Sequence, residues 1–345
     1  MVAQEDIIVG LDIGTTKICA VVGERQGNMI NIIGTGTHPS IGLKKGVVID
    51  IESTVDSIKK AVEEAELMAG CEITSVYAGI AGGHIMGFNS HGIIAIKGRE
   101  VTQSDVDRVI EAARAVAIPM DREVIHVLPQ EFIVDDQRGI QNPIGMAGVR
   151  LEANIHIVTG AVASAHNIIK CANKAGLDVA DVVLESLASG EAVLTPEEKE
   201  LGTALIDIGG GTTDIAVISH GATVISDSIK MAGDKFDDAV RRYMKRKHSL
   251  YIGERNAEDI KIAYGRAHTE KEQRVIEVRG RSVVTGLPEA IPIGTNEMVE
   301  ALSEPLGAIM ERVRGLLERT PPELVKDIAS TGIVVTGGGA LLAGF

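Results

Sequence analysis

The 345-residue chain is poor in aromatic side chains and in cysteine. Aromatic residues make up 2% of the sequence and tryptophan is absent, which argues against carbohydrate or single-strand nucleic-acid sites built from stacked rings. The three cysteines, Cys19, Cys71 and Cys171, are odd in number and share no CxxC spacing. This pattern favours reduced thiols in a cytoplasm over a disulfide framework or a zinc site.

The chain also lacks an excess of positive charge and long apolar runs. Its net charge is −14, so we expect no nucleic-acid partner, because such binding requires a basic face that displaces counterions. No stretch approaches the roughly 18 apolar residues that a membrane-spanning helix requires. The one basic run, at residues 241–248, is typical of a solvated helix face.

The length of the chain and a change in residue pattern along it predict more than one structural unit. At roughly 150 residues per domain, the chain has room for two or more. Residues 82–160 differ from the rest and indicate an α+β segment around one helix that begins at Thr102. We expect residues 1–81 and 161–227 to form a first lobe, residues 82–160 to be a subdomain inserted into it, and residues 228–345 to form a second lobe.

Two segments repeat the order of apolar strand, acidic residue, glycine turn and Thr-Thr pair. They lie at residues 12–17 and 207–214, and this repetition predicts two related halves. Glycine lets backbone amides approach an anion, threonine hydroxyls add donors, and a lysine supplies a charge suited to a phosphate. A plain hairpin turn is the alternative for either segment alone. The expected phosphate-binding residues are Gly14, Thr15, Thr16, Lys17, Gly209, Gly210, Gly211, Thr212 and Thr213.

Acidic residues accompany both turns. Asp12 and Asp207 each stand near the end of an apolar strand and are placed to hold Mg²⁺, Asp12 through water, since this ion keeps much of its hydration shell. Asp207 is also expected to act in catalysis beside the β- and γ-phosphates. Glu185 ends another strand, and it is either a structural or helix-capping carboxylate or the group that orients an attacking water.

A third glycine turn, at residues 336–340, contains Gly337, Gly338 and Gly339. Two phosphate-type turns followed by this one favour a nucleotide site over three unrelated turns. Their order resembles that in the superfamily of actin, heat-shock chaperones and sugar kinases. The resemblance implies an α/β, two-lobed actin-like ATPase fold of duplicated ribonuclease-H-like domains, here with an inserted α+β subdomain. It also implies ATP and Mg²⁺ in the cleft, with the third turn as the adenosine loop.

Shorter motifs narrow the resemblance to two families. Residues from about 5 to 220 resemble the FtsA family of bacterial cell-division proteins, at segments 10–17, 42–48, 98–102, 127–132 and 193–202. From about residue 228 onward the motifs resemble the actin homologue MreB, at segments 228–237, 252–261, 280–288 and 318–324. The MreB resemblance places Glu258 and Lys261 at the adenosine, where spacing alone permits a surface ion pair.

These resemblances imply an ATP-binding cell-division protein that assembles head to tail and links FtsZ filaments to the membrane at the division site, on its cytoplasmic face. The expected partners are FtsZ, other division proteins and further copies of the chain. Hydrolysis is expected to be slow at most and to regulate assembly. The alternatives are an MreB-like cell-shape ATPase and, in other classes, a small-molecule kinase or a chaperone-like ATPase of the superfamily.

The chain stops at Phe345, shortly after the third glycine turn. We therefore expect the last elements of the first lobe to lie outside this sequence. Membrane contact is expected only through an amphipathic segment that is also outside it.

Overall fold

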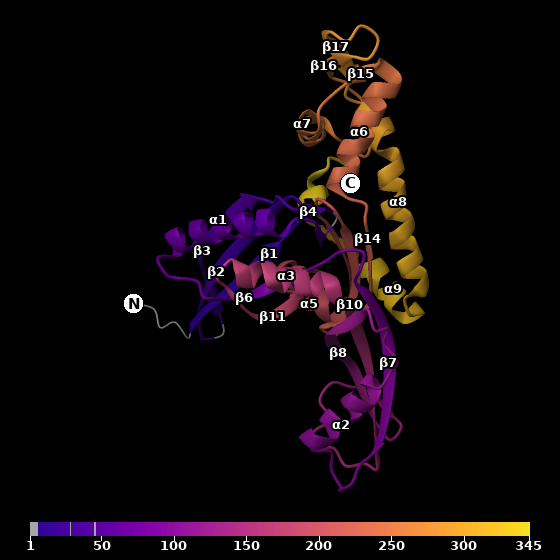
Figure 1. The fold of residues 1–345 in the computed structure, drawn as a ribbon. Helices are drawn as coiled ribbons and strands as arrows, with labels where there is room; N and C mark the ends of the chain where they lie inside the picture. Colours follow the sequence, from indigo (N-terminus) through magenta and orange to yellow (C-terminus); the bar gives the residue numbers. More distant parts are fainter. Residues whose placement is uncertain (1–5, 28, 45) are drawn as a thin grey trace.

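The computed structural model describes residues 6–27, 29–44 and 46–345 (Figure 1). Lys45, within the FtsA-like segment 42–48, lies outside the described residues. In chain order the elements are β1 (Ile7–Ile13), β2 (Lys17–Gln26), β3 (Met29–Pro39), β4 (Leu43–Lys44), β5 (Val47–Val48), α1 (Ile51–Ala69), β6 (Ser75–Ile80), β7 (Met86–Ala95), α2 (Gln103–Arg114), β8 (Arg122–Val134), β9 (Gln137–Ile140), β10 (Arg150–Ala161), α3 (Val162–Lys174), β11 (Asp178–Leu184), α4 (Glu185–Val193), α5 (Pro196–Leu201), β12 (Thr203–Ile208), β13 (Thr213–Ser219), β14 (Ala222–Ile229), α6 (Gly233–His248), β15 (Leu250–Tyr251), α7 (Glu254–Tyr264), β16 (Val275–Ser282), β17 (Pro288–Gly294), α8 (Glu297–Arg319), α9 (Pro322–Thr331), β18 (Ile333–Thr336) and the 3₁₀ helix η2 (Gly338–Leu341).

Capping residues set the ends of the helices predicted in the first half. Helix α1 begins after Asp50, whose carboxylate accepts hydrogen bonds from the first-turn amides, and ends at Gly70, which has a left-handed φ of 68°. Helix α2 begins after Thr102, which forms a reciprocal capping box with Asp105. The helix expected from Thr102 is confirmed as α2.

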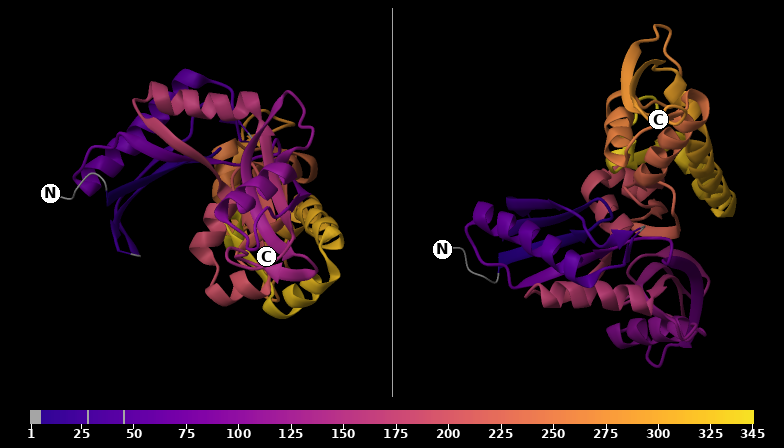
Figure 2. Two further views of the ribbon diagram at one scale, coloured as in Figure 1. Left: turned by 90° about the horizontal axis from the view of Figure 1, so that it is seen from below. Right: turned by 45° about the horizontal axis from the view of Figure 1, so that its top comes forward.

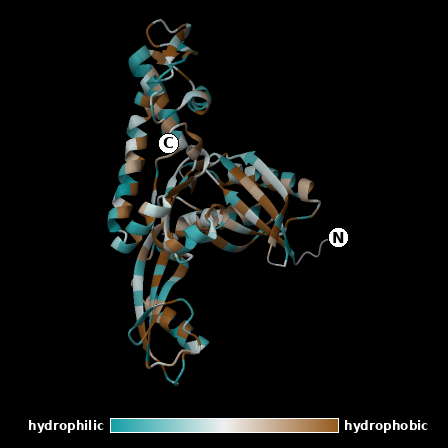
Figure 3. Cartoon of the chain, turned by 180° about the vertical axis from the view of Figure 1, so that it is seen from behind, coloured by the Kyte–Doolittle hydropathy of each residue, from teal (hydrophilic) through white to brown (hydrophobic). Residues whose placement is uncertain are grey.

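The first sheet has the strand order β11-β6-β1-β2-β3. Strands β1, β2 and β3 pair antiparallel, β6 pairs parallel with β1, and β11 pairs parallel with β6. Helices α1 and α3 pack against each other and against this sheet, around buried side chains such as Leu11, Ile58 and Ile168. The strands of this sheet are largely brown in Figure 3, as expected of strands that build a core.

The second sheet repeats this topology, with the order β14-β13-β12-β18. Strands β12, β13 and β14 pair antiparallel and β18 pairs parallel with β12, as β6 does with β1 in the first sheet. Asp12 and Asp207 are the penultimate residues of β1 and β12, so they hold equivalent places in the two sheets. The predicted duplication is confirmed.

The sheets divide the chain at a different point from the one that the sequence suggested. Residues 161–227 were assigned to the first lobe, but strands β12, β13 and β14 hydrogen-bond into the second sheet. The last strand of the first sheet is β11, and α4 and α5 follow it. We therefore propose that the lobes divide within residues 185–202 instead of at residue 227.

The inserted segment forms its own sheet, β7-β10-β8-β9, with α2 packed on it. Figures 1 and 2 show it at the opposite end of the molecule from the β16–β17 hairpin of the second lobe. Its strands also contact β14: the Gln130 side-chain amide donates to the carbonyl oxygens of Thr223 and Val224, at 3.1 and 3.0 Å, and His156 Nε2 lies 3.2 Å from Ser226 Oγ. The insert is therefore attached to the second lobe as well as to the first.

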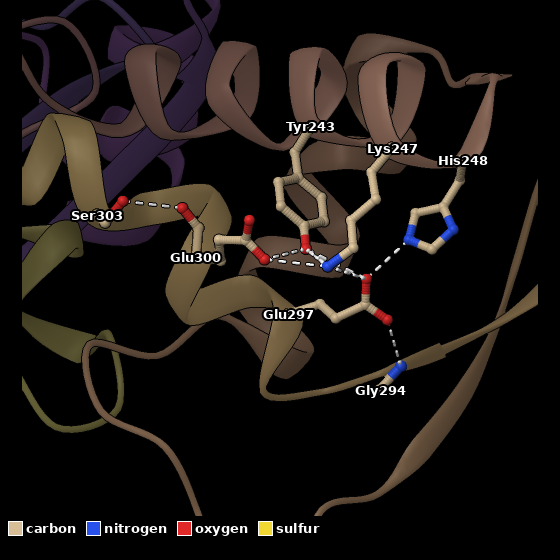
Figure 4. A network of polar contacts seen from close by, with 7 residues as sticks. All are labelled: Tyr243, Lys247, His248, Gly294, Glu297, Glu300 and Ser303. Carbon is tan, nitrogen blue, oxygen red and sulfur yellow. Dashed lines mark hydrogen bonds and ion pairs between the residues drawn. The ribbon is translucent and has the colours of Figure 1, made fainter.

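Helices α6 and α8 of the second lobe are joined by a polar network (Figure 4). Tyr243 donates to Glu300 at 2.7 Å, Lys247 Nζ donates to Glu300 at 3.0 Å, and His248 Nε2 lies 2.7 Å from Glu297. Burial raises the pKa of Tyr243 to about 12, so it remains a hydrogen-bond donor. The sequence predicted a solvated helix face for the basic run at 241–248. Two residues of this run instead contact α8, Lys247 through Glu300 and His248 through Glu297.

Substituting Gly36→Ala is expected to destabilise the chain. A Cβ at Gly36 would lie 2.0 Å from the Ala61 carbonyl oxygen, because β3 passes directly against α1 at this point. A backbone carbonyl cannot rotate away as a flexible side chain can, so strand and helix must separate. We expect the free energy of unfolding to fall by about 2–3 kcal/mol, measured by urea denaturation.

The matched control for this substitution is Gly10→Ala in the same sheet. A Cβ at Gly10 meets no atom within 4 Å, and its free energy of unfolding should change by less than about 1 kcal/mol. Equal effects of the two substitutions would contradict the close approach of β3 and α1.

Candidate functional site

One cavity of about 570 Å³ lies where the two lobes meet, and it collects nearly all the residues that the sequence singled out. The first glycine turn, the second glycine turn and the third form parts of its wall, together with α4, α6 and α7. The predicted residues that line it are Asp12, Gly14, Thr15, Thr16, Lys17, Glu185, Asp207, Gly209, Gly210, Gly211, Thr212, Glu258, Lys261, Gly337, Gly338 and Gly339. Thr213 is the exception.

The first turn is held by backbone contacts and leaves its polar groups exposed. A Cβ at Gly14 would lie 2.8 Å from the Lys17 carbonyl oxygen, so the turn is too tight for a side chain there. Thr15 Oγ1 accepts a 2.9 Å hydrogen bond from the amide of Gly46. Thr16 and Lys17 are exposed toward the cavity. The turn therefore offers a hydroxyl and an ammonium group to an anion.

The second turn comes from the other sheet and touches the first. A Cβ at Gly210 would lie 1.8 Å from Thr16 Oγ1, so only glycine permits this approach without displacing the threonine. The turn is closed by the Gly209 amide, which donates to the Thr212 carbonyl at 3.0 Å. It is also docked on the start of α6, where the Asp234 amide donates to the Gly210 carbonyl at 2.8 Å.

Thr213 lies outside the cavity, against the prediction that it binds phosphate. It is fully buried at the start of β13, and its hydroxyl donates a 2.6 Å hydrogen bond to the Met231 carbonyl. Its neighbour Thr212 lines the cavity instead. Adjacent side chains in extended backbone point in opposite directions, so only one of the pair can face the cleft.

Carboxylates gather at the floor of the cleft. Burial raises the pKa of Asp12 to about 6, with a further increase from Asp207 and an opposing effect of Lys17. Burial and the neighbouring Asp12, Asp214 and Asp207 raise the pKa of Glu185 well above its usual range. Burial also raises the pKa of Asp214 to about 6. Asp214 does not line the cavity itself but pairs directly with Asp207 across the β12–β13 ladder.

The arrangement fits a hydrated Mg²⁺ better than a directly ligated one. In the described part of the chain, no three His, Cys, Asp or Glu side chains are grouped closely enough to ligate a metal. Asp12 Oδ1 is nevertheless buried without a hydrogen-bond partner, which is an open acceptor for metal-bound water. Mg²⁺ commonly keeps several waters and is held by one or two carboxylates together with substrate phosphates.

Glu185 is positioned by the first sheet and by the insert. It is the first residue of α4, directly after β11, and a Cβ at Gly79 of β6 would lie 3.2 Å from its Cγ. The preceding amide, of Leu184, donates a 3.0 Å hydrogen bond to His126 Nε2 of the inserted β8. Burial lowers the pKa of His126, which favours the neutral ring that can accept this bond.

The third turn lies against the end of β12. Gly337 has a φ of 81°, and a Cβ there would lie 2.4 Å from Asp207 Oδ1. A Cβ at Gly339 would lie 2.2 Å from Ile208 Cγ2. Gly338, by contrast, meets no atom within 4 Å and faces the cavity. Two of the three glycines are thus required by packing, and Gly338 leaves room for a ligand.

Glu258 and Lys261 line the cavity from α7 but do not pair with each other. Lys261 Nζ lies 2.9 Å from Asp237 Oδ2 of α6, an acidic residue that the sequence analysis did not single out. Asp234 is a second acidic lining residue that was not singled out, and two apolar ones are well exposed: Ile262 by 73% and Leu341 by 87%. In the sequence, Ile262 and Leu341 are marked only by their position, directly after the predicted Lys261 and directly after the third glycine turn.

Comparisons with known proteins agree with this architecture. A model of the SHS2 domain inserted in FtsA matches residues 82–159, and a model of the MreB/Mbl protein family matches residues 155–345. The cell division protein FtsA of Pseudomonas aeruginosa is 45% identical over 339 residues, 98% of this chain and 79% of that protein. FtsA of Escherichia coli K12 is 39% identical over 341 residues, 98% of this chain and 80% of that protein.

The chain belongs to the FtsA family. The predicted relationship to both FtsA and MreB is confirmed, and the similarity to FtsA extends beyond residue 220 to nearly the whole chain. Members of this family are cell-division proteins, and a role in cell division follows for this member. No helix in the described ranges combines the length and apolar character needed to cross a bilayer.

Solved structures share the actin-like fold. MreB5 of Spiroplasma citri bound to ADP has a TM-score of 0.62 at 24% identity, over 99% of this chain and 87% of that one. The MamK double helical filament has a TM-score of 0.57 at 16% identity, over 98% and 87%. The two-lobed fold predicted from the three turns is confirmed.

Replacing Asp214 with asparagine is expected to stabilise the ligand-free chain at neutral pH. The pKa of this 9% exposed carboxyl is raised from 3.8 to about 6, so between these values the folded chain holds a proton that the unfolded chain releases. The stability that it contributes is complete below about pH 4 and is lost as the pH rises through 6. Asp214→Asn should raise the free energy of unfolding by about 1–3 kcal/mol near pH 7.5.

The gain should shrink toward pH 5, where the native Asp214 already holds its proton. Urea denaturation at both pH values, at constant ionic strength, measures it. Asp136→Asn, at a fully exposed carboxylate, is the control and should show no pH-dependent gain. A gain for Asp214→Asn that is the same at both pH values would contradict the assigned protonation.

Proposed function

We propose that the chain binds ATP with Mg²⁺ in the cleft between its lobes and acts in cell division as an actin-like assembly protein. The observation that carries this proposal is the contact of Gly210 with Thr16, which brings glycine turns from two separate sheets over one group of carboxylates. Turns of this kind bind phosphate through backbone amides, and the acidic floor needs a cation to accept a polyphosphate beside it. MreB5 of Spiroplasma citri has been solved with ADP and with AMPPNP, which supports the same ligand class here.

In this proposal the two turns hold the phosphates and Lys17 adds a positive charge. Asp12 and Asp207 hold Mg²⁺ through its water shell, and the ion neutralises charge on the phosphate oxygens. Glu185, which faces the cavity near both, orients the attacking water. Hydrolysis at such a site is slow and serves to time assembly.

The adenosine would lie at the opposite end of the cavity. Glu258 and Lys261 provide polar groups there, while the exposed Ile262 and Leu341 provide an apolar wall for a flat base. Gly338 leaves the open space between them and the phosphates. We therefore infer that this end of the cavity, built from α7 and η2, recognises the nucleoside.

Substituting Gly338→Val is expected to weaken ATP binding at least ten-fold. A Cβ at this position meets no protein atom within 4 Å, and the residue lines the cavity that the nucleoside would occupy, so we expect the fold to remain and the ligand to be obstructed. Isothermal titration calorimetry with ATP and Mg²⁺ measures the change. Gly210→Val would also abolish binding, but it displaces Thr16 and is a less specific test.

The matched control is Gly307→Val on the exposed face of α8. A Cβ at Gly307 also meets no atom within 4 Å, and the residue is outside the cavity. Its ATP affinity should equal that of the wild type. Unchanged affinity of the Gly338→Val variant would refute the position proposed for the nucleoside.

We further propose that the chain assembles head to tail, links FtsZ filaments to the membrane through a segment outside this sequence, and acts at the cytoplasmic face of the division site. The FtsA-type insert favours this role over that of an MreB-like cell-shape protein. A head-to-tail contact is heterologous, so it does not close and it generates filaments. Filament formation by the structural relative MamK supports the self-association.

Sedimentation at rising protein concentration tests assembly. We expect weak association that requires ATP, with a Kd in the micromolar range, about −8 kcal/mol at 1 μM, and more pelleted protein when FtsZ filaments are added. A strict monomer at high concentration with and without ATP would exclude the filament. Pelleting that is indifferent to FtsZ would exclude the proposed link.

A further inference from the structure

Helix α4 presents two polar residues toward the cleft. Glu185 and Ser189 are four residues apart, a spacing that places them on the same face of a helix. Ser189 Oγ donates a 2.7 Å hydrogen bond to Asp207 Oδ2. Ser189 does not line the cavity itself, so any effect that it has on a ligand must pass through Asp207.

The Asp207 carboxylate is hydrogen-bonded at one oxygen and lies close to the backbone of the third turn at the other. Oδ2 accepts the hydrogen bond from Ser189, and Oδ1 lies so close to the backbone of the third turn that a Cβ at Gly337 would be 2.4 Å away. A carboxylate that accepts a hydrogen bond at one oxygen and has little space beside the other loses rotational freedom, and its remaining lone pairs keep a narrower range of directions. Hydrogen-bond partners of this kind orient metal-binding carboxylates and tune their affinity.

We propose that Ser189 is a positioning residue, which holds the Asp207 carboxylate in the orientation that receives the hydrated Mg²⁺ of a bound nucleotide. This inference rests on the proposed nucleotide site and adds a residue to it. Helix α4 follows the last strand of the first sheet and precedes the first strand of the second. The same hydrogen bond therefore fixes Glu185, one turn earlier on α4, relative to Asp207.

Nucleotide titrations with Mg²⁺ and with EDTA test this role. In Ser189→Ala the extra affinity for ADP that Mg²⁺ confers should fall roughly ten-fold, the lower end for loss of such a partner, while the affinity in EDTA stays within two-fold of wild type. Ser189→Thr, which keeps the hydroxyl, should restore most of the Mg²⁺-dependent gain. An equal loss with and without Mg²⁺, or no loss, would overturn the proposal, because a purely structural serine would not distinguish the two conditions.

Ser330→Ala in α9 is the matched control, because its hydroxyl donates only to the Asp327 carbonyl of its own helix and lies outside the cavity. It should bind ADP as the wild type does in both conditions. Any selective loss of Mg²⁺-dependent affinity in this variant would overturn the assignment to Ser189.

A double-mutant cycle on the ligand-free chain separates failure of this inference from failure of the proposed function. Ser189→Ala and Asp207→Ala are compared singly and together by urea denaturation. If the hydrogen bond positions Asp207, the effect of Ser189→Ala on the unfolding equilibrium constant should be at least three-fold smaller when Asp207 is absent. Additive effects would overturn the positioning role. A wild-type chain that binds no ADP would refute the nucleotide site and, with it, the role toward Mg²⁺, even if the cycle shows coupling.

Discussion

The contact between Gly210 and Thr16 is the constraint on which the cleft depends. Each sheet ends its first strand in an aspartate and a glycine turn, and the duplicated topology brings the two turns face to face. Any side chain at position 210 would have its Cβ 1.8 Å from the threonine hydroxyl, and Thr16 would have to leave its place between the turns. Glycine at this position therefore keeps the Thr16 hydroxyl beside the second turn, at the entropic cost of ordering a glycine.

The carboxylates beneath that contact oppose folding at neutral pH. Asp12 and Asp214, with pKa values raised to about 6, and Glu185, whose pKa is raised further, repel one another in a buried space. A packed core would not retain such a group, since neutral side chains would stabilise it more. Its presence is consistent with a site where a cation is bound, and binding to the folded state alone would return stability.

The sequence predicted the parts that are encoded locally. The aspartates, the glycine turns and the cap at Thr102 follow from short-range spacing, and their positions were recognised without a structure. Thr213 was misassigned because strand alternation was not applied across the Thr-Thr pair. Asp237 and Ile262, which line the cavity from helices, were not predicted, because only tertiary packing brings α6 and α7 to the turns. The proposed shift of the lobe boundary has the same origin, since it follows from strand pairing over long separations.

The insert is more than an appendage of the first lobe. Its Gln130 and His156 bond to β14 of the second sheet, and its His126 accepts the amide hydrogen of Leu184, directly before Glu185. A change in the position of α4 must therefore either carry β8 with it or break the bond to His126. Helix α4 also lies in the segment that joins the two sheets. It therefore connects the two lobes, contacts the insert at its first turn, and carries the candidate catalytic residue Glu185. A contact made by the insert with another molecule would therefore act on the same helix that carries Glu185 into the proposed nucleotide site.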